Sequence, residues 1–258
     1  MAELLFIGTG SGKVSLNRFH SSFLILTSRY NLLIDAGDGI SKALLKQKID
    51  FTSIDGIIFT HLHPDHYSGL AALIVQMKMC ERKKQLDIYI NSGLLDVIKN
   101  FILNSYLFPE KMGFEIRYIP FTENEKIRIN EEVGFLPRQN SHLNVVSELE
   151  QYQSQSFSSS SLLLNIGNRK IHYTSDIGNK DDLLLFEDFY YDYLISEATH
   201  IKPEDIIDIP DKNVLPKKII LTHVSDEGAA KLEKFLSVLQ SYIQRRVILA
   251  FDGLRFAL

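Results

Sequence analysis

The chain has little of what would assign it to several common classes of protein. Cys80 is the only cysteine among 258 residues, which excludes an internal disulfide and a zinc cluster built on thiolates. The formal net charge is −4, so the chain lacks the overall basic field that nucleic-acid binders commonly carry. No segment approaches the roughly 18 consecutive apolar residues that a membrane span needs. The opening residues, MAELLFIGTG, have no positive leader and no cleavage site. We therefore expect a cytoplasmic protein with no membrane span.

Short apolar runs bounded by turn residues alternate with helical patterns along the sequence. The runs typical of strands are Leu4–Ile7, Phe23–Leu26, Leu32–Ile34, Ile57–Phe59, Leu86–Ile90, Phe114–Phe121, Val133–Leu136, Leu162–Ile166, Lys170–Thr174, Tyr193–Ser196 and Lys218–Thr222. Helical patterns cover Ile40–Gln47, Gly69–Cys80, Leu94–Tyr106 and Asp226–Gln244. The alternation predicts an α/β fold with two mixed sheets covered by helices, in one domain over residues 1–258.

Two further segments lead to specific expectations. Val247–Phe251 and Leu254–Leu258 flank Asp252-Gly253, which predicts a closing hairpin. Glutamine and serine crowd Glu148–Ser161, most densely over residues 154–161. We expect a mobile surface loop there in preference to a lid or a substrate arm.

The most informative segment is Thr-His-Leu-His-Pro-Asp-His, which follows a buried apolar run and ends at His66. It places His61, His63, Asp65 and His66 within six residues. A single histidine at such a position is usually a core residue satisfied by a hydrogen bond. Three imidazoles and a carboxylate this close would repel one another or remain unpaired without a cation. Because imidazole and carboxylate are good ligands for zinc and related ions, the cluster predicts a metal site.

Further candidate ligands follow later strands. His142 comes shortly after Val133–Leu136, Asp176 follows Lys170–Thr174, and His223 follows Lys218–Thr222. Each of these residues alone is typical of a capped or exposed polar group. Their shared position after buried strands indicates that they complete a site for two metal ions with the early cluster.

With these candidate ligands, the chain resembles the metallo-β-lactamase fold superfamily. The similarity lies in the order of the seven candidate ligands, in Ile34-Asp35-Ala36-Gly37 and in Ala250-Phe251-Asp252-Gly253. It implies an αββα sandwich with the metals at one edge between the sheets. The nearest branch is ribonuclease Z-like, which Gly8-Thr9-Gly10, Glu197-Ala198-Thr199 and Leu221-Thr222-His223-Val224-Ser225 resemble.

The resemblance implies a division of the ligands and also has clear departures. One metal would be held by His61, His63 and His142, the other by Asp65, His66 and His223, and Asp176 would bridge both. Ser196 stands where ribonuclease Z proteins begin their Glu-Ala-Thr motif with histidine. Their His-Ser-Thr motif, with its proton-donating histidine, and their tRNA-gripping arm have no counterpart in this sequence. These departures argue against tRNA as the substrate.

The leading hypothesis is a dinuclear hydrolase, most consistent with a phosphodiesterase on a nucleotide-like or nucleic-acid substrate that is attacked by hydroxide held at the metals. Asp65 and His200 are the candidate catalytic residues. His200 follows the Glu197–Thr199 motif and titrates near neutral pH, so it could replace the missing proton donor, with a structural or surface role as the alternative. Asp35, Thr60 and Glu197 are candidates to orient ligand imidazoles by hydrogen bonds.

Several alternatives stay open at this stage. A thioester or lactone hydrolase would use a similar ligand set, and a non-catalytic metal-binding scaffold is the alternative of another class. Two divalent ions are expected as cofactors, zinc first and manganese or iron otherwise, because the same ligands suit all three. The oligomeric state is open, with a homodimer the form common among similar proteins.

Overall fold

Two seven-stranded sheets form the framework of the protein. The structure, a computed structural model, describes residues 2–144, 156–208 and 216–258. Within them, the first sheet runs in the order β14 (Arg255–Ala257), β1 (Glu3–Gly8), β2 (Ser22–Leu26), β3 (Leu32–Ile34), β4 (Gly56–Ile58), β5 (Leu86–Asn91) and β6 (Ile116–Phe121). The second runs in the order β13 (Val247–Leu249), β12 (Lys218–Thr222), β11 (Tyr193–Glu197), β10 (Arg169–Tyr173), β9 (Ser160–Ile166), β8 (Val133–Gln139) and β7 (Ile127–Arg128).

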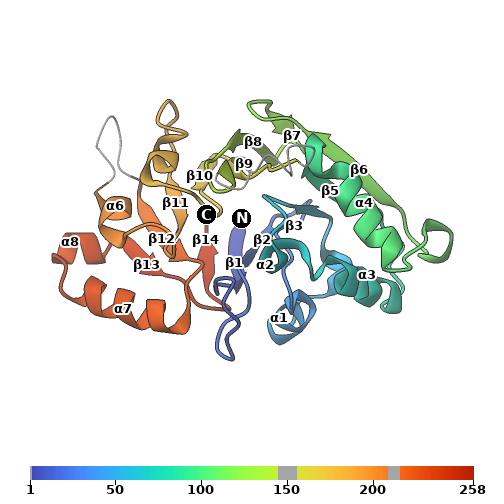
Figure 1. The fold of residues 1–258 in the computed structure, drawn as a ribbon, viewed down its shortest axis with the longest axis horizontal. Coiled ribbons are helices and arrows are strands. Elements are labelled where there is room, and N and C mark those ends of the chain that lie inside the picture. Colours follow the sequence, from blue (N-terminus) through green and yellow to red (C-terminus); the bar gives the residue numbers. More distant parts are fainter. Residues whose placement is uncertain (1, 145–155, 209–215) are drawn as a thin grey trace.

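Helices cover the outer faces of the sheets. They are α1 (Ile40–Lys46), α2 (Pro64–Tyr67), α3 (Leu70–Met79), α4 (Leu95–Asn104), α6 (Pro203–Ile207), α7 (Asp226–Ser237) and α8 (Ser241–Gln244). Figure 1 shows α1, α3 and α4 on one flank of the molecule and α6, α7 and α8 on the other. No helix within the described residues is long and apolar enough to cross a membrane.

Alternating side chains on each strand separate an inner core from two outer ones. Phe6, Phe23, Phe135 and Leu164 belong to the core between the sheets. Leu33 and its neighbours on the first sheet pack instead against α1 and α3. Since successive strand residues point to opposite faces, each sheet is buried on both sides. This is the αββα sandwich, and the fold expected from the sequence is confirmed.

Each sheet is half antiparallel and half parallel. In the first sheet the strands from β3 to β6 are parallel, and in the second sheet those from β10 to β13 are parallel. The carboxyl ends of parallel strands meet at one edge of a sheet, where ligand sites usually form. The loops that leave β3, β4, β10 and β12 carry most of the candidate site residues.

Three local expectations were wrong. The helical pattern over Asp226–Gln244 is two helices, because α7 ends at Ser237 and α8 begins at Ser241. The last two strands do not form a hairpin: β13 pairs with β12 in the second sheet, and β14 pairs with β1 in the first. The Asp252-Gly253 turn thus crosses between the sheets, and Gly253 takes a φ of +96° there.

The third wrong expectation is the surface loop over the serine-rich segment Glu148–Ser161. Residues 148–155 lie outside the described residues. The end of the segment is not a surface loop, because Ser159, Ser160 and Ser161 are buried and the last two begin β9. The backbone amide of Ser160 donates to the carbonyl oxygen of Thr60 over 3.1 Å, which joins the two sheets at this point.

Candidate metal centre

The early ligand cluster lies on a tight loop and a one-turn helix after β4. His61 is buried just beyond the strand, His63 caps α2, and Pro64 occupies the first turn of that helix, where its missing N–H costs nothing. Two glycines let this helix touch the loop after β3. A Cβ at Gly37 would lie 1.9 Å from the carbonyl oxygen of Asp65, and a Cβ at Gly69 would lie 2.1 Å from that of Gly37. Only glycine, which has no Cβ, fits at these two positions.

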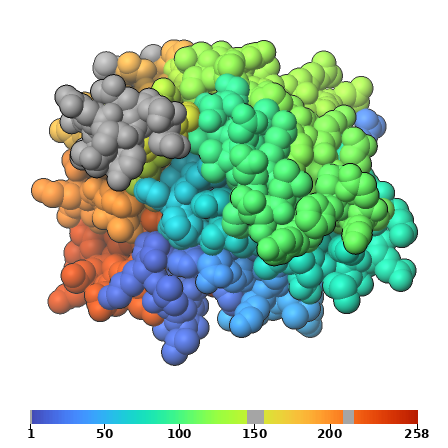
Figure 2. Space-filling view, turned by 45° about the vertical axis from the view of Figure 1, so that its right-hand side comes forward, coloured from blue at the N-terminus to red at the C-terminus, as the bar shows by residue number. Residues whose placement is uncertain are grey.

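The later candidate ligands come from the second sheet. His142 follows β8, Asp176 follows β10 and His223 follows β12. The structure brings all three to the early cluster, in two groups that consist only of the predicted ligands and whose ligand atoms lie within 4.8 Å of one another. The first group contains His61, His63, His142 and Asp176, and the second contains Asp65, His66, Asp176 and His223. Figure 2 shows the cyan segment that carries α2 reaching the surface between the dark blue N-terminal loop and the orange part of the second half.

Imidazole nitrogens converge in the first group. Nδ1 of His63 lies 3.2 Å from Nε2 of His61 and 3.1 Å from Nε2 of His142. Nε2 of His142 lies 3.7 Å from Oδ2 of Asp176.

The second group meets the other oxygen of the same carboxylate. Oδ1 of Asp176 lies 3.4 Å from Nε2 of His66 and 3.3 Å from Nε2 of His223. Oδ2 of Asp65 lies 3.3 Å from Nε2 of His223 and 3.6 Å from Nε2 of His66. Each oxygen of Asp176 therefore faces one group, which is the arrangement of a carboxylate that bridges two ions.

These distances fit divalent metal ions. Ligands about 2.1 Å from a tetrahedral zinc ion lie about 3.4 Å from one another, close to the separations in both groups. Within the described part of the chain, Nε2 of His66 and Oδ1 of Asp176 are buried and have no hydrogen-bond partner. Buried polar atoms rarely remain unpaired, so a cation between them would satisfy both.

Asp35 orients the ligands that come from the first sheet. Its carboxylate accepts from Nδ1 of His66 at 2.8 Å and from both the backbone N and Oγ1 of Thr60 at 2.9 Å. The bond from Nδ1 leaves Nε2 of His66 free for a metal. Oγ1 of Thr60 in turn lies 3.2 Å from Nδ1 of His61 and accepts from Ser175 at 2.8 Å. Asp35 and Ser175 both have positive φ, 60° and 55°, which side-chain-bearing residues seldom adopt.

A buried carboxylate ties together the loops that carry His142 and Asp176. Asp182 accepts from the backbone N of Ser141 at 3.1 Å and from that of Gly178 at 2.9 Å. Gly178 permits the close approach, since a Cβ there would lie 2.5 Å from the carbonyl oxygen of Ser141. Asp182 therefore joins the two loops directly.

His223 occupies a strained turn that distant segments hold. Its φ is +56°. Oγ1 of Thr199 donates to its carbonyl oxygen, and the backbone N of Val224 donates to the carbonyl oxygen of Thr9 at 3.0 Å. Thr9 is itself fixed by Asp252, which accepts from its N at 2.9 Å and from its Oγ1 at 2.8 Å. Strain of this kind persists only where the surroundings enforce it.

Sequence reasoning missed several of these supporting residues, among them Thr9, Ser175, Asp182, Thr199 and Asp252. In the sequence, Gly8-Thr9-Gly10 indicates only a family resemblance, and Asp252-Gly253 a turn. Neither segment carries a local signal that it contacts the other, because Thr9 and Asp252 are 243 positions apart.

His200 lies at the rim of the site beside both groups. Its ring centroid is 5.2 Å from that of His142 and 6.0 Å from that of His223, and 41% of its side chain is exposed. Nδ1 of His200 lies 3.1 Å from Oε1 of the buried Glu197, whose Oε2 accepts from the backbone N of His200 at 2.9 Å. Among the contacts of the described residues, Glu197 thus holds His200 rather than a ligand imidazole by direct hydrogen bonds.

The electrostatics match the protonation states that a metal requires in most of the ligands. Burial lowers the pKa of His142 to about 4 and holds the pKa of His61 well below its usual value. Burial disfavours ionised Asp65, but its hydrogen bond to His223 and the nearby His66 outweigh this and lower its pKa to about 2. His66 is the exception: burial opposes its charge, yet the carboxylates of Asp176 and Asp35 raise its pKa well above the usual value. An ion that binds must therefore displace a proton from His66.

A comparison with protein families identifies the group to which the chain belongs. The family model described as "Anti-Pycsar protein Apyc1" matches residues 2–243. The chain is a member of this family. The match covers all seven candidate ligands and the strands of both sheets up to β12, and it ends before β13 and β14.

Ribonuclease Z proteins are among its relatives. The chain is 32% identical over 129 residues to ribonuclease Z of Metallosphaera sedula, a match that covers 50% of this chain and 43% of that protein. For ribonuclease Z of Aeropyrum pernix the identity is 32% over 133 residues, with 51% and 42% covered. The chain thus matches less than half the length of these relatives. The ribonuclease Z-like resemblance expected from the sequence is confirmed.

Solved structures agree with the fold over the whole chain. The metallo-β-lactamase fold protein YhfI from Bacillus subtilis has a TM-score of 0.74 at 19% identity, with 99% of this chain and 98% of that chain covered. The short form of human tRNase Z has a TM-score of 0.72 at 22% identity, with the same shares covered. A diphosphatase from the PhnP family has a TM-score of 0.70 at 19% identity, with 100% and 98% covered.

Proposed function

We propose that this protein is a metal-dependent hydrolase that cleaves a phosphodiester in a nucleotide-like or nucleic-acid substrate. The observation that carries the proposal is the position of Asp176, whose Oδ1 and Oδ2 each face one of two complete ligand groups. A scaffold that only bound a metal would need one such group. Two ions held at a fixed separation are the arrangement used to clamp a phosphate.

The ligands leave the site positively charged when two divalent ions are bound. Asp65 and Asp176 are the only acidic members of the two groups, so four positive charges would meet two negative ones. Such a pair of ions supplies Lewis acidity and lowers the pKa of water to near neutrality. The chain's own part is to fix the ligands through Asp35 and Asp182 and to leave the anion an open approach on the side of His200.

His200 is the proposed proton donor to the leaving oxygen. The hydrogen bond from its ring to Glu197 raises the pKa of His200, so its Nε2 can carry a proton at neutral pH. Replacing His200 with Ala should lower turnover about 10²-fold for a substrate with an alkoxide leaving group. Turnover of a p-nitrophenyl ester should change little, because that leaving group needs no proton.

Two measurements separate this role from a structural one. Metal content by elemental analysis should be equal in the parent and in His200→Ala, and His200→Gln should behave like His200→Ala. Equal losses with both leaving groups, or a loss of metal, would contradict proton donation.

The substrate class follows from the relatives and from what the chain omits. Relatives named ribonuclease Z and a neighbour named as a diphosphatase favour a phosphate ester over other bonds. A short nucleotide-like substrate is favoured over tRNA, because only residues 143–159 separate His142 from β9 and leave no room for a gripping arm.

The test of the reaction class uses the metal-loaded protein with bis(p-nitrophenyl) phosphate, a lactone and a thioester in parallel. We expect turnover of the phosphodiester alone. Preferential turnover of the lactone or thioester would overturn the proposal, and no turnover of any of the three with both ions bound would favour a scaffold. Elemental analysis of the purified protein identifies the ions. Zinc is expected, as in the zinc-bound PqqB structure that shares this fold, with manganese or iron as the alternatives.

A further inference from the structure

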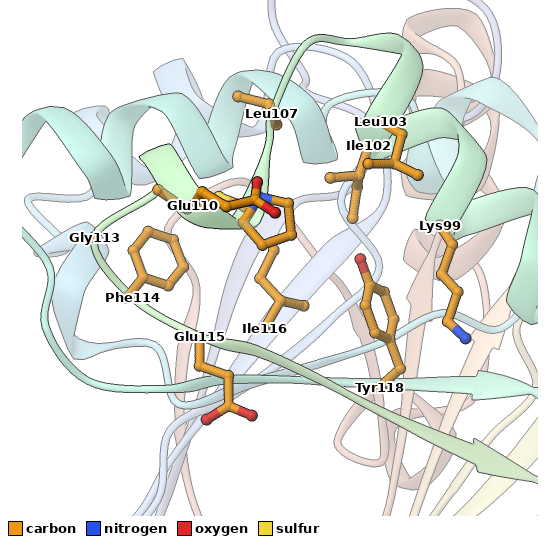
Figure 3. Close-up of a pocket in the computed structure, with 12 residues that line it drawn as sticks. Lys99, Ile102, Leu103, Leu107, Glu110, Gly113, Phe114, Glu115, Ile116 and Tyr118 are labelled. Atoms are coloured by element: carbon orange, nitrogen blue, oxygen red, sulfur yellow. The ribbon is translucent and has the colours of Figure 1, made fainter.

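Several cavities lie away from the metal edge, and two of them differ clearly in chemistry. The larger, of about 640 Å³, lies between α4 and the chain that enters β6 and has an apolar lining. Figure 3 shows the hydroxyl of Tyr118 pointing into it, with Lys99 at one side and Glu110 and Glu115 at another. Charges of both signs at its rim select no single ligand.

The smaller cavity, of about 280 Å³, has a more selective lining. It lies on the outer face of the second sheet and is lined by Asn124, Lys126, Leu136, Arg138, Leu163, Asn165, Lys170 and Phe189. Leu136 and Leu163 are direct partners on β8 and β9 and form an apolar floor. Asn165 and Lys170, partners on β9 and β10, lie on the same face one step further along.

Two of the three cationic side chains that line this pocket have no paired carboxylate among the described residues. Arg138 is paired with Asp188, to which its guanidinium donates at 2.6 and 2.9 Å. Lys126 and Lys170 have no carboxylate within ion-pair distance among residues 2–144, 156–208 and 216–258, and no acidic residue of these ranges lines the pocket. Two ammonium groups that face one cavity without counter-ions favour a divalent anion.

The remaining groups suit the body of a ligand. The ring of Phe189 forms one wall and is held by Arg138 and Lys170, which lie 5.2 and 5.8 Å from its centroid. The backbone N of Asn124 donates to the carbonyl oxygen of Pro137 at 2.8 Å, which fixes the loop of Lys126 against β8. Asn124 and Asn165 each offer an amide donor and acceptor, the pair that recognises the edge of a nucleobase.

We propose that this pocket binds a small phosphorylated ligand with a flat body, of which a nucleoside monophosphate is the simplest. The phosphate would lie between Lys126 and Lys170, and the flat body would rest on Leu136 and Leu163. The pocket shares no residue with either metal group. The proposal therefore stands apart from the proposed phosphodiesterase activity.

The experiment is equilibrium dialysis and calorimetry of the metal-loaded protein with UMP and AMP, beside inorganic phosphate and uridine. Lys126→Ala/Lys170→Ala should bind one equivalent fewer of the monophosphate than the parent, or bind that equivalent about tenfold more weakly or worse. Phosphate alone and uridine alone should each bind this pocket more weakly than the monophosphate. Turnover of bis(p-nitrophenyl) phosphate, measured without added nucleotide, should be unchanged.

Lys42→Ala/Lys231→Ala is the matched control, since it removes two exposed lysines elsewhere and should leave the stoichiometry as in the parent. Lys126→Gln/Lys170→Gln repeats the test if the alanine variant is less stable. Equal binding in the parent and in both pocket variants overturns the proposal. It is equally overturned if inorganic phosphate binds the pocket as tightly as the monophosphate does, because the flat body would then contribute nothing.

Discussion

The two ligand groups that share Asp176 are supported to different degrees. In the second group His66 and His223 are buried, Asp35 holds the ring of His66, and two carboxylates would face a bound ion. In the first group His63 and His142 are partly exposed, and Asp176 is the only carboxylate. A site with more charge and less access to water holds a divalent ion more tightly. The second group should therefore retain its ion longer, and the first should exchange more readily with solvent.

Removal of the shared residue gives the largest expected effect. Asp176→Asn takes a charged ligand from both groups at once, so both ions should be lost and turnover should fall by about 10³-fold or more. Elemental analysis and the phosphodiester assay measure this. Asp96→Asn, an exposed carboxylate on α4, is the matched control and should keep both ions. Retention of one full equivalent of metal in Asp176→Asn would break the idea of a shared ligand.

Asp35→Asn tests mainly the second group, because Asp35 bonds His66 directly and reaches His61 of the first group only through Thr60. The amide can no longer accept from both Nδ1 of His66 and Thr60 as a charged group, so affinity for one ion should fall about 10- to 100-fold. Dialysis against graded chelator, followed by elemental analysis, should show one ion released much earlier than in the parent and the other affected less. If both ions weakened equally, the two groups would not be independent in their support.

A smaller effect is expected at the turn of His223. Thr199→Val removes the hydroxyl that donates to the carbonyl oxygen of His223, a hydrogen bond worth about 1 kcal/mol. The same chelator titration should show about a fivefold loss of affinity for the second ion. Thr122→Val, which removes a hydroxyl that donates to the exposed Glu125, should show no such loss. If turnover fell while metal affinity stayed intact, Thr199 would position His200 and not the ligand His223.

The smallest effect should come from a histidine outside both groups. His172 is fully buried between Phe186 and Tyr191, and neither ring nitrogen has a partner among the described residues. Its replacement by Leu should leave both ions bound and raise the free energy of unfolding by about 1 kcal/mol at neutral pH. Thermal and urea unfolding measure the change. A clear destabilisation would mean that the imidazole has a partner after all.

The same residue contributes to acid sensitivity. Burial lowers the pKa of His172 to about 3, whereas the unfolded chain has the ordinary value near 6.5. The unfolded state therefore binds the proton first, and stability falls as pH drops below 6.5, by about 1.4 kcal/mol per unit until about pH 3. Between pH 6 and 4 the parent should lose more stability than His172→Leu. Parallel curves would contradict this.

How much the sequence could predict depended on how local each feature is. His61, His63, Asp65 and His66 lie in one short segment, so their joint chemistry was readable without knowledge of the fold. His142, Asp176 and His223 are single residues, and only their position after apolar strands indicated that they meet. For Asp176 and His223 that inference depends on the parallel half of the second sheet, whose carboxyl ends meet at one edge, whereas β8, which precedes His142, lies in the antiparallel half.

Features that depend on distant pairings could not be predicted. The strands at Val247–Leu249 and Arg255–Ala257 alternate like a hairpin, and nothing in their residues states that each joins a different sheet. The break after Ser237 lies in a stretch whose apolar spacing continues through Leu239, so periodicity alone predicts one helix. Contacts such as Thr9 with Asp252 appear only once the fold exists.

The metal centre draws His61, Asp65 and His66 from the first sheet's side of the sandwich and His142, Asp176 and His223 from the second sheet's side. An ion bound by residues from both sides would link the two layers. Because only the folded protein brings these ligands together, the free energy of metal binding adds to the stability of the fold. Saturation with metal should thus raise the melting temperature of the entire chain, and a chelator should lower both this melting temperature and the turnover.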